Sequence, residues 1–132
     1  MFERIVLGLS ALIWLPYGVY CFFVPEVLAG ADSAGVVAST PTAVTEIRAM
    51  YGGLQAAIGA LAVAALMRPR LASGVLLSLV FITGGLASTR LMGLLMDGGF
   101  SAYTGGGLGF EIVSCAAALL ALRQGGTFRV AA

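Results

Sequence analysis

Long apolar stretches, separated by short polar turns, dominate the pattern along this chain. Four stretches reach the length of about 20 residues that a helix needs to cross the hydrocarbon of a bilayer. They cover residues 5–24, 42–67, 71–96 and 103–122. The pattern therefore predicts an all-α fold, a four-helix transmembrane bundle that forms a single domain over residues 1–132.

The turns between the stretches carry residues that begin and end helices. Thr40 is suited to cap the second stretch, because Pro41 then takes the first helical position. The Arg-Pro-Arg run at 68–70 leaves almost no connector before the third stretch, and the Asp-Gly-Gly run at 97–99 is typical of a turn. Only the connector 26–40 has room for a small surface helix.

The composition is that of a protein that lies in a lipid bilayer, and it excludes several classes of function. Charged residues make up 10% of the chain, against about 25% in soluble domains. The chain has no His, the commonest general base and metal ligand, and no Lys for Schiff-base or phosphate-loop chemistry. The net charge of +1 gives no basic face for nucleic acid. We expect no metal, no cofactor and no nucleic-acid partner.

The arginines outside the apolar stretches fall on one side of the predicted bundle. They are Arg4, Arg68, Arg70, Arg123 and Arg129. The opposite side carries Glu26, Asp32 and Asp97. The positive-inside rule then predicts cytoplasmic termini (N-in/C-in) for a multi-pass membrane protein. A cleavable signal peptide is the alternative for the first stretch, but about 20 apolar residues exceed the usual 7–15-residue core.

Three ionisable residues, Arg48, Arg90 and Glu111, lie inside the apolar stretches. Such residues are costly in hydrocarbon and usually pair or line a wet cavity. Counting about 1.5 Å per residue from the cytoplasmic arginines puts both inner arginines near the outer hydrocarbon edge. The same count puts one polar residue of each helix in a single layer at about 18–20 Å. These residues are Tyr17, Gln55, Thr83 and Glu111.

Side-chain direction brings Arg90 and Glu111 together. Helical side chains lean toward their own N-terminus, so Arg90 leans down from the third helix and Glu111 leans up from the fourth. We interpret the pair either as the base of a polar cavity that opens to the periplasm, or as a buried ion pair that only fixes helix register. The candidate ligand-binding residues are Arg90, Glu111, Arg48, Gln55, Tyr51, Tyr17 and Glu46.

Several of these residues have a plainer interpretation. Arg48 and Glu46 are suited to anchor a helix at the membrane interface, and the tyrosines can serve as interface or core aromatics. Small residues spaced by four indicate close helix packing, within one bundle or across a homodimer. They are Gly52, Ala56, Ala60 and Ala64 in the second helix and Gly105 and Gly109 in the fourth. Cys21 and Cys115 lie at different depths, so we expect no disulfide.

The runs Glu46-Ile47-Arg48-Ala49-Met50-Tyr51-Gly52-Gly53 and Arg90-Leu91-Met92-Gly93, with Pro25 and Glu111, resemble a bacterial membrane family. That family is described only as a domain of unknown function, number 4345, and the likeness covers nearly the whole chain. The family is similar in architecture to the DoxX-like group of four-helix membrane proteins. The resemblance implies a compact inner-membrane bundle and leaves the catalytic residues, if there are any, unknown.

Three functions compete. The first is a non-enzymatic ligand-binding or accessory subunit that holds an anionic amphiphile or lipid, alone or in a larger membrane complex or homo-oligomer, since Arg suits carboxylates and phosphates. The second is an enzyme or enzyme subunit that acts on a lipid or quinone with Glu111 as its acid–base group. The third is a small transporter or channel. We rank them in this order, because only one carboxylate reaches the polar layer.

Overall fold

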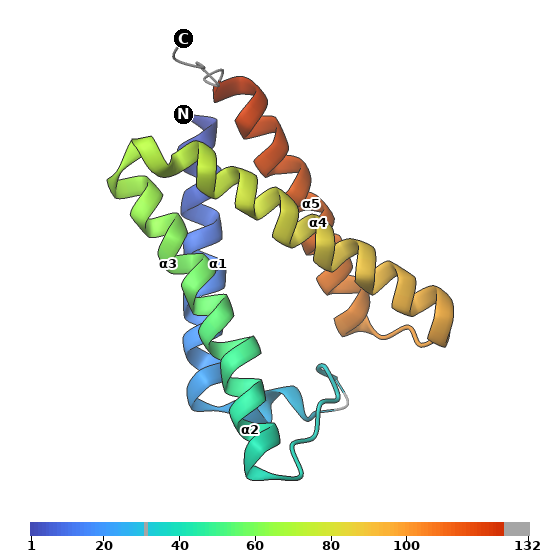
Figure 1. Cartoon of the computed structure of the whole chain (residues 1–132). Helices are drawn as coiled ribbons and strands as arrows, with labels where there is room; N and C mark the ends of the chain where they lie inside the picture. Colours follow the sequence, from blue (N-terminus) through green and yellow to red (C-terminus); the bar gives the residue numbers. More distant parts are fainter. Residues whose placement is uncertain (31, 126–132) are drawn as a thin grey trace.

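A computed structural model describes residues 1–30 and 32–125, all of them in helices, turns or connectors (Figure 1). Arg129, one of the arginines counted for orientation, lies outside these residues. The α-helices are α1 (Phe2–Phe23), α2 (Pro41–Ile47), α3 (Leu54–Met67), α4 (Ala72–Asp97) and α5 (Ala102–Gly125). Two 3₁₀ turns, η1 (Pro25–Leu28) and η3 (Pro69–Leu71), and a π-helical segment, η2 (Arg48–Gly53), complete the order.

Within the part of the chain that the structure describes, four helices are long and apolar enough to cross a membrane. They are Phe2–Phe23, Pro41–Met67, Pro69–Asp97 and Ala102–Gln124. The second joins α2, η2 and α3, and the third joins η3 and α4. The predicted all-α bundle of four spanning helices is confirmed, and the helix ends fall within a few residues of the predicted bounds. The chain thus has the makeup of a multi-pass membrane protein.

The predicted helix signals act as expected. The Thr40 hydroxyl accepts a hydrogen bond from the Ala43 backbone N–H at 3.1 Å, and Pro41 takes the first helical position. Gly98 ends α4 in the left-handed region at φ 68°, where glycine pays no steric cost. In the connector after α1, the small helix is the 3₁₀ turn η1, and the Val36 N–H donates back to its last carbonyl, that of Leu28, at 2.9 Å.

The helices form two pairs. Helix α1 packs along α3, and α4 packs along α5, with fewer contacts between the pairs. Figure 1 shows the start of α1, the end of α5 and the α3–α4 turn at one end of the bundle, which we call the termini end. Toward the other end, the connector end, α4 and α5 diverge from α1 and α3 (Figure 1).

Burial in this bundle differs from that in a soluble domain. Alanines share the centre with larger side chains such as Leu7, Trp14 and Leu76, and many large apolar side chains point outward. Buried small residues are Ala11, Ala62, Ala65, Ala72, Ala118 and Ala121, and exposed large ones include Leu12, Phe23, Phe81, Leu95 and Val113. Soluble proteins place such large residues inside. A lipid environment removes the drive to bury them, and small residues let helices come close.

Three glycines fix the contact between α1 and the helix opposite. A Cβ on Gly18 would lie 2.2 Å from the Ala56 backbone nitrogen, one on Gly52 would lie 2.8 Å from the Phe22 Cβ, and one on Gly59 would lie 2.4 Å from the Leu15 nitrogen. The backbones therefore touch. We call these three glycines the glycine seam.

The predicted stripes of small residues need correction. Gly52 and Ala56 lie in the seam, but Ala60 is exposed and the seam continues through Gly59. A spacing of four exceeds the 3.6 residues of a helical turn, so such a stripe drifts around the helix, and Gly59, seven residues after Gly52, returns to the α1 side. In α5, Gly105 faces the Phe100 ring of its own connector, and no atom lies within 4 Å of a Cβ built on Gly109.

Candidate functional site

Arg90 and Glu111 form a bidentate ion pair between α4 and α5, as predicted. The Arg90 Nη2 donates to Glu111 Oε1 at 2.7 Å, and the Nε donates to Oε2 at 3.0 Å and to Oε1 at 3.2 Å. Two parallel N–H···O bonds fix the guanidinium plane as well as its position. Both glutamate oxygens are engaged by one arginine.

Gly107 makes room for this pair. It lies one turn before Glu111 on α5, and a Cβ at this position would be 3.1 Å from the Arg90 Cζ. The Arg90 guanidinium therefore crosses the bare backbone of α5 to reach the carboxylate. A larger residue at position 107 would push the guanidinium away from its partner.

The two members of the pair differ in exposure. The Glu111 side chain is 4% exposed and the Arg90 side chain is 27% exposed. The bonds to Glu111 use the Nε–Nη2 edge of the guanidinium, and Nη1 makes no hydrogen bond with any described residue. The carboxylate is thus enclosed, while one guanidinium edge remains available.

Two tyrosines connect this pair to the rest of the bundle. The hydroxyls of Tyr17 on α1 and Tyr103 on α5 lie 3.4 Å apart, and this contact joins the two helix pairs. Tyr103 lies on the same face of α5 as Glu111, since positions 103, 107 and 111 are spaced by four. Tyr51 is half-buried and packs, as Tyr17 does, against the cluster around Cys21. The contact between Tyr17 and Tyr103 therefore links α1 to the face of α5 that carries Glu111.

Two buried polar atoms have no hydrogen-bond partner among the described residues. They are the amide oxygen of Gln55 on α3 and the indole nitrogen of Trp14 on α1. The Trp14 ring contacts Phe110, whose neighbour in the chain is Glu111, at 5.7 Å between centroids. An unpaired buried acceptor or donor costs roughly 1–3 kcal/mol. Such atoms mark a place where a ligand group or a water molecule would be favourable.

Thr83 does not contribute to the polar layer in the predicted way. Its side chain is fully buried, and its hydroxyl donates to the Leu79 carbonyl of the same helix at 2.7 Å. A threonine in a helix satisfies itself in this manner when no other acceptor is near. The Thr83 hydroxyl therefore has no hydrogen left to donate to another helix, and counting residues along the helix could not show this.

Arg48 and Glu46 lie apart from the pair in their contacts. The exposed Arg48 donates its Nε–H to the Phe22 carbonyl in the last turn of α1 at 3.1 Å. Carbonyls there lack helical partners, and a cation is favourable beside them. Glu46 is exposed, and no hydrogen bond or ion pair joins it to another described side chain. The structure brings neither residue into contact with Glu111.

Two small pockets lie at the connector end of the bundle. One of about 210 Å³ is lined by Pro25, Glu26, Ala29, Val36, Val37, Ala38, Val44 and Ile47. The other, of about 170 Å³, is lined by Val19, Phe22, Phe23, Gly52, Gly53 and Ala56. Neither is lined by Arg90 or Glu111. The cavity expected between Tyr17, Gln55, Arg90 and Glu111 stays a prediction.

Sequence reasoning missed Tyr103 as a bonding partner, and it recognised that Gly107 leaves room for a ligand chain or a close helix contact without connecting that room to Arg90. The signal was present. Tyr103, Gly107 and Glu111 are spaced by four and therefore lie on one face of α5. The Gly105–Gly109 spacing pointed to a different face of α5, which does not pack against Arg90. The predicted absence of a disulfide is confirmed, since Cys21 and Cys115 are both free.

A family model described as "Domain of unknown function (DUF4345)" matches residues 2–122. No curated protein and no solved structure matches the chain. The match includes every residue of the ion pair and its surroundings, and it confirms the resemblance seen in the sequence. The likeness to the DoxX-like group stays a prediction. Because the model matches nearly the whole chain, the protein belongs to the DUF4345 family.

Proposed function

We propose that this protein is a non-enzymatic, ligand-binding module of the bacterial inner membrane. Its ligand is an acidic amphiphile, such as a fatty acid, whose carboxylate binds Arg90. Glu111 holds the guanidinium in place, and Tyr17, Tyr51 and Gln55 offer further hydrogen bonds. The site opens toward the periplasmic side.

The observation that carries the proposal is that Glu111 uses only some of the N–H donors of the Arg90 guanidinium. Glu111 occupies the Nε–Nη2 edge, whereas Nη1 and the second N–H of Nη2 make no bond with the described side chains. An arginine has five N–H donors in a fixed fork. The edge that remains matches the two oxygens of a second carboxylate.

Charge decides where in the membrane this ligand lies. The Arg90–Glu111 pair is neutral as a unit, so an added carboxylate leaves the site with one net negative charge. Such a charge is costly in hydrocarbon unless it keeps part of its hydration. The Arg90 side chain is 27% exposed, and the proposal places this exposed part in water at the periplasmic side. A fatty acid with its carboxylate at Arg90 and its tail among the helices or lipids keeps its charge partly hydrated and its hydrocarbon chain in an apolar environment.

The orphaned polar atoms support the same site. Gln55 lies on α3, across the bundle from the ion pair, and its amide oxygen has no described partner. This atom has no solvent access in the present conformation, and an ionised carboxylate has no hydrogen to donate to it. A water molecule that enters with the ligand, when the two helix pairs separate slightly, would satisfy the oxygen and return the roughly 1–3 kcal/mol that its burial costs.

Catalysis fits the geometry less well. Glu111 is the carboxylate of the polar layer, and both of its oxygens accept hydrogen bonds from Arg90. A general base must reach the proton that it removes. Here the base would first have to leave its arginine, at the cost of breaking a buried pair.

Thermal unfolding in maltoside micelles tests the proposal. Oleate should raise the melting temperature of the wild type by several degrees, because a ligand that binds only the folded state stabilises it. Oleyl alcohol has the same chain without the carboxylate and should have little effect. Arg90→Gln should lose most of the oleate shift. Arg70→Gln, at the exposed termini end of the bundle, is the matched control and should keep it. An equal oleate shift in Arg90→Gln and Arg70→Gln would contradict the proposal.

Cysteine labelling tests the orientation. In a background without Cys21 and Cys115, a cysteine at Asp32 or Gly98 should react with a membrane-impermeant maleimide in intact spheroplasts. A cysteine at Pro69 should react only after permeabilisation. These positions are exposed and lie at opposite ends of the bundle. The reverse result would turn the site toward the cytoplasm.

A further inference from the structure

A lipid-facing groove runs between the last turns of α1 and the π-helical segment η2. It encloses about 170 Å³, and its lining is entirely apolar. Val19, Phe22 and Phe23 form one wall and are exposed on the outer surface of the bundle. Gly52, Gly53 and Ala56 form the floor and the other wall. A hydrocarbon chain of the bilayer meets this groove directly.

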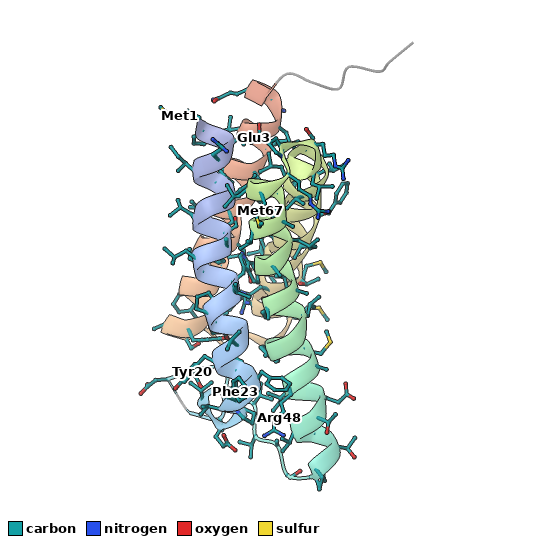
Figure 2. All side chains as sticks on the ribbon, turned by 90° about the vertical axis from the view of Figure 1, so that its left-hand side faces the viewer. Met1, Glu3, Tyr20, Phe23, Arg48 and Met67 are labelled. Atoms are coloured by element: carbon teal, nitrogen blue, oxygen red, sulfur yellow. The ribbon has the colours of Figure 1, made fainter. Side chains whose placement is uncertain are left out.

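A fixed cation lies beside the groove. Arg48 begins η2, and its Nε–H donates to the carbonyl of Phe22, a groove residue, at 3.1 Å. Its two terminal nitrogens make no hydrogen bond with the described residues. Figure 2 shows Arg48 close to Phe23, at the end of the bundle opposite Met1 and Met67. The guanidinium is therefore held at the end of α1 and about two turns inside the helix Pro41–Met67, and an arginine side chain at such a position can extend to the lipid headgroups.

The floor of the groove is open because Gly53 has no side chain. A Cβ built on Gly53 meets nothing nearer than the Arg48 carbonyl oxygen at 3.7 Å, so close packing does not require glycine here. Gly52 differs, because its Cβ would lie 2.8 Å from the Phe22 Cβ. The segment is also π-helical, a conformation found mostly as short bulges and often at functional sites. Gly53 can thus be filled without separating the helices.

We infer that this groove binds a phospholipid of the surrounding bilayer, with an acyl chain along Val19, Phe22 and Gly53 and the phosphate at Arg48. The apolar lining suits the chain, and a guanidinium that is free at its terminal nitrogens suits the phosphate oxygens. The site lies on the α1 side of the bundle and uses none of the Arg90–Glu111 contacts. It is therefore independent of the fatty-acid site.

Photo-crosslinking in maltoside micelles tests this inference. The probe is a phosphatidylglycerol with a diazirine in one acyl chain, and its matched control is a diacylglycerol with the same chains and no phosphate. Phosphatidylglycerol should label the peptides that contain Val19–Phe23 and Arg48–Ala56 several-fold more than diacylglycerol does. Gly53→Leu fills the groove and should lower that labelling several-fold.

Three further variants separate the alternatives. Arg48→Gln should remove the preference for phosphatidylglycerol and leave labelling by diacylglycerol unchanged. Gly74→Leu adds the same bulk to an exposed and open position on α4 and should change nothing. Arg90→Gln should also change nothing, so the two sites can fail separately. Labelling that survives both Gly53→Leu and Arg48→Gln, or equal labelling by the two probes in the wild type, would overturn the inference.

Discussion

The two helix pairs of this bundle achieve close contact by different means. In the α1/α3 pair, the glycine seam brings backbone against backbone, and Gly18 leaves no space for even a methyl group. In the α4/α5 pair, a bidentate ion pair crosses between the helices over the bare backbone of Gly107. The glycine seam is apolar and has no hydrogen-bonding group that needs a partner. The Arg90–Glu111 pair is polar and leaves N–H donors of the guanidinium without a partner among the described residues.

The difference shows where function can reside. Van der Waals contact between small residues drives helix association in membranes, and it offers no hydrogen bond to a ligand. Ionisable groups inside a span are costly, and they persist where they pair or bind. The α4/α5 contact carries this cost together with a guanidinium edge that Glu111 does not occupy. We therefore place the centre of the candidate site, the Arg90 guanidinium, on α4 and α5, whereas the close packing of α1 with the second spanning helix rests on the glycine seam.

Loss of Arg90 should have the largest effect on stability. Arg90→Ala leaves a glutamate that is 4% exposed without its partner, and breaking a buried pair costs roughly 3–5 kcal/mol. Glu111→Ala should cost less, because the more exposed Arg90 can extend toward water. The free energy of unfolding, from SDS titration in mixed micelles, measures both. The double variant should lose less than the sum of the two, and simple additivity would show that the residues do not act as a pair.

A methyl group in the glycine seam should have the next largest effect. Gly18→Ala forces two backbones apart and should cost about 1–3 kcal/mol, the usual range for overpacking. Gly8→Ala is the matched control on the same helix, because nothing lies within 4 Å of its added Cβ. It should stabilise the protein by about 0.5–1 kcal/mol, since alanine favours helix over glycine. Equal effects at the two positions would show that the seam is not a tight contact.

Gly107→Ala should have the smallest effect on folding. Its Cβ would lie 3.1 Å from the Arg90 Cζ, and a long side chain can move by a few tenths of an ångström. We expect a loss below about 1 kcal/mol. The same shift disturbs the guanidinium edge that the ligand uses, so the oleate-induced rise in melting temperature should fall more than stability does. A large loss of stability with an intact oleate response would show that Gly107 serves helix packing and not the ligand site.

The lengths of the apolar stretches and the depth of residues along the helices were enough to predict the spanning helices and the Arg90–Glu111 pair. Spanning length, the Thr40-Pro41 start and the Gly98 end depend on local sequence, and the structure has each of them. The Arg90–Glu111 pair followed from depth and side-chain lean, which are regular in helices. These inferences use one helix, or two helices at known heights, and no detail of packing.

Rotation about each helix axis was harder to predict. A spacing of four drifts from the 3.6-residue period of the helix, so the seam uses Gly59, seven residues after Gly52, where that spacing pointed to Ala60. Thr83 has the right depth, but it bonds to its own helix. Arg48 has the right charge, but it bonds to the end of α1. Depth says how high a residue lies, and only packing says which neighbour it faces.

A single distance tests the central claim most directly, that the free edge of the Arg90 guanidinium binds a carboxylate. Solid-state NMR on protein with ¹⁵N-labelled arginine, mixed with oleate labelled with ¹³C at its carboxyl carbon, measures the dipolar coupling between guanidinium nitrogen and carboxylate carbon. The account predicts a coupling that reports direct hydrogen-bonded contact in the wild type. That coupling should remain in Arg48→Gln and disappear in Arg90→Gln. A wild type without it, or a coupling that persists in Arg90→Gln, would contradict the account and leave Arg90 and Glu111 as a structural ion pair.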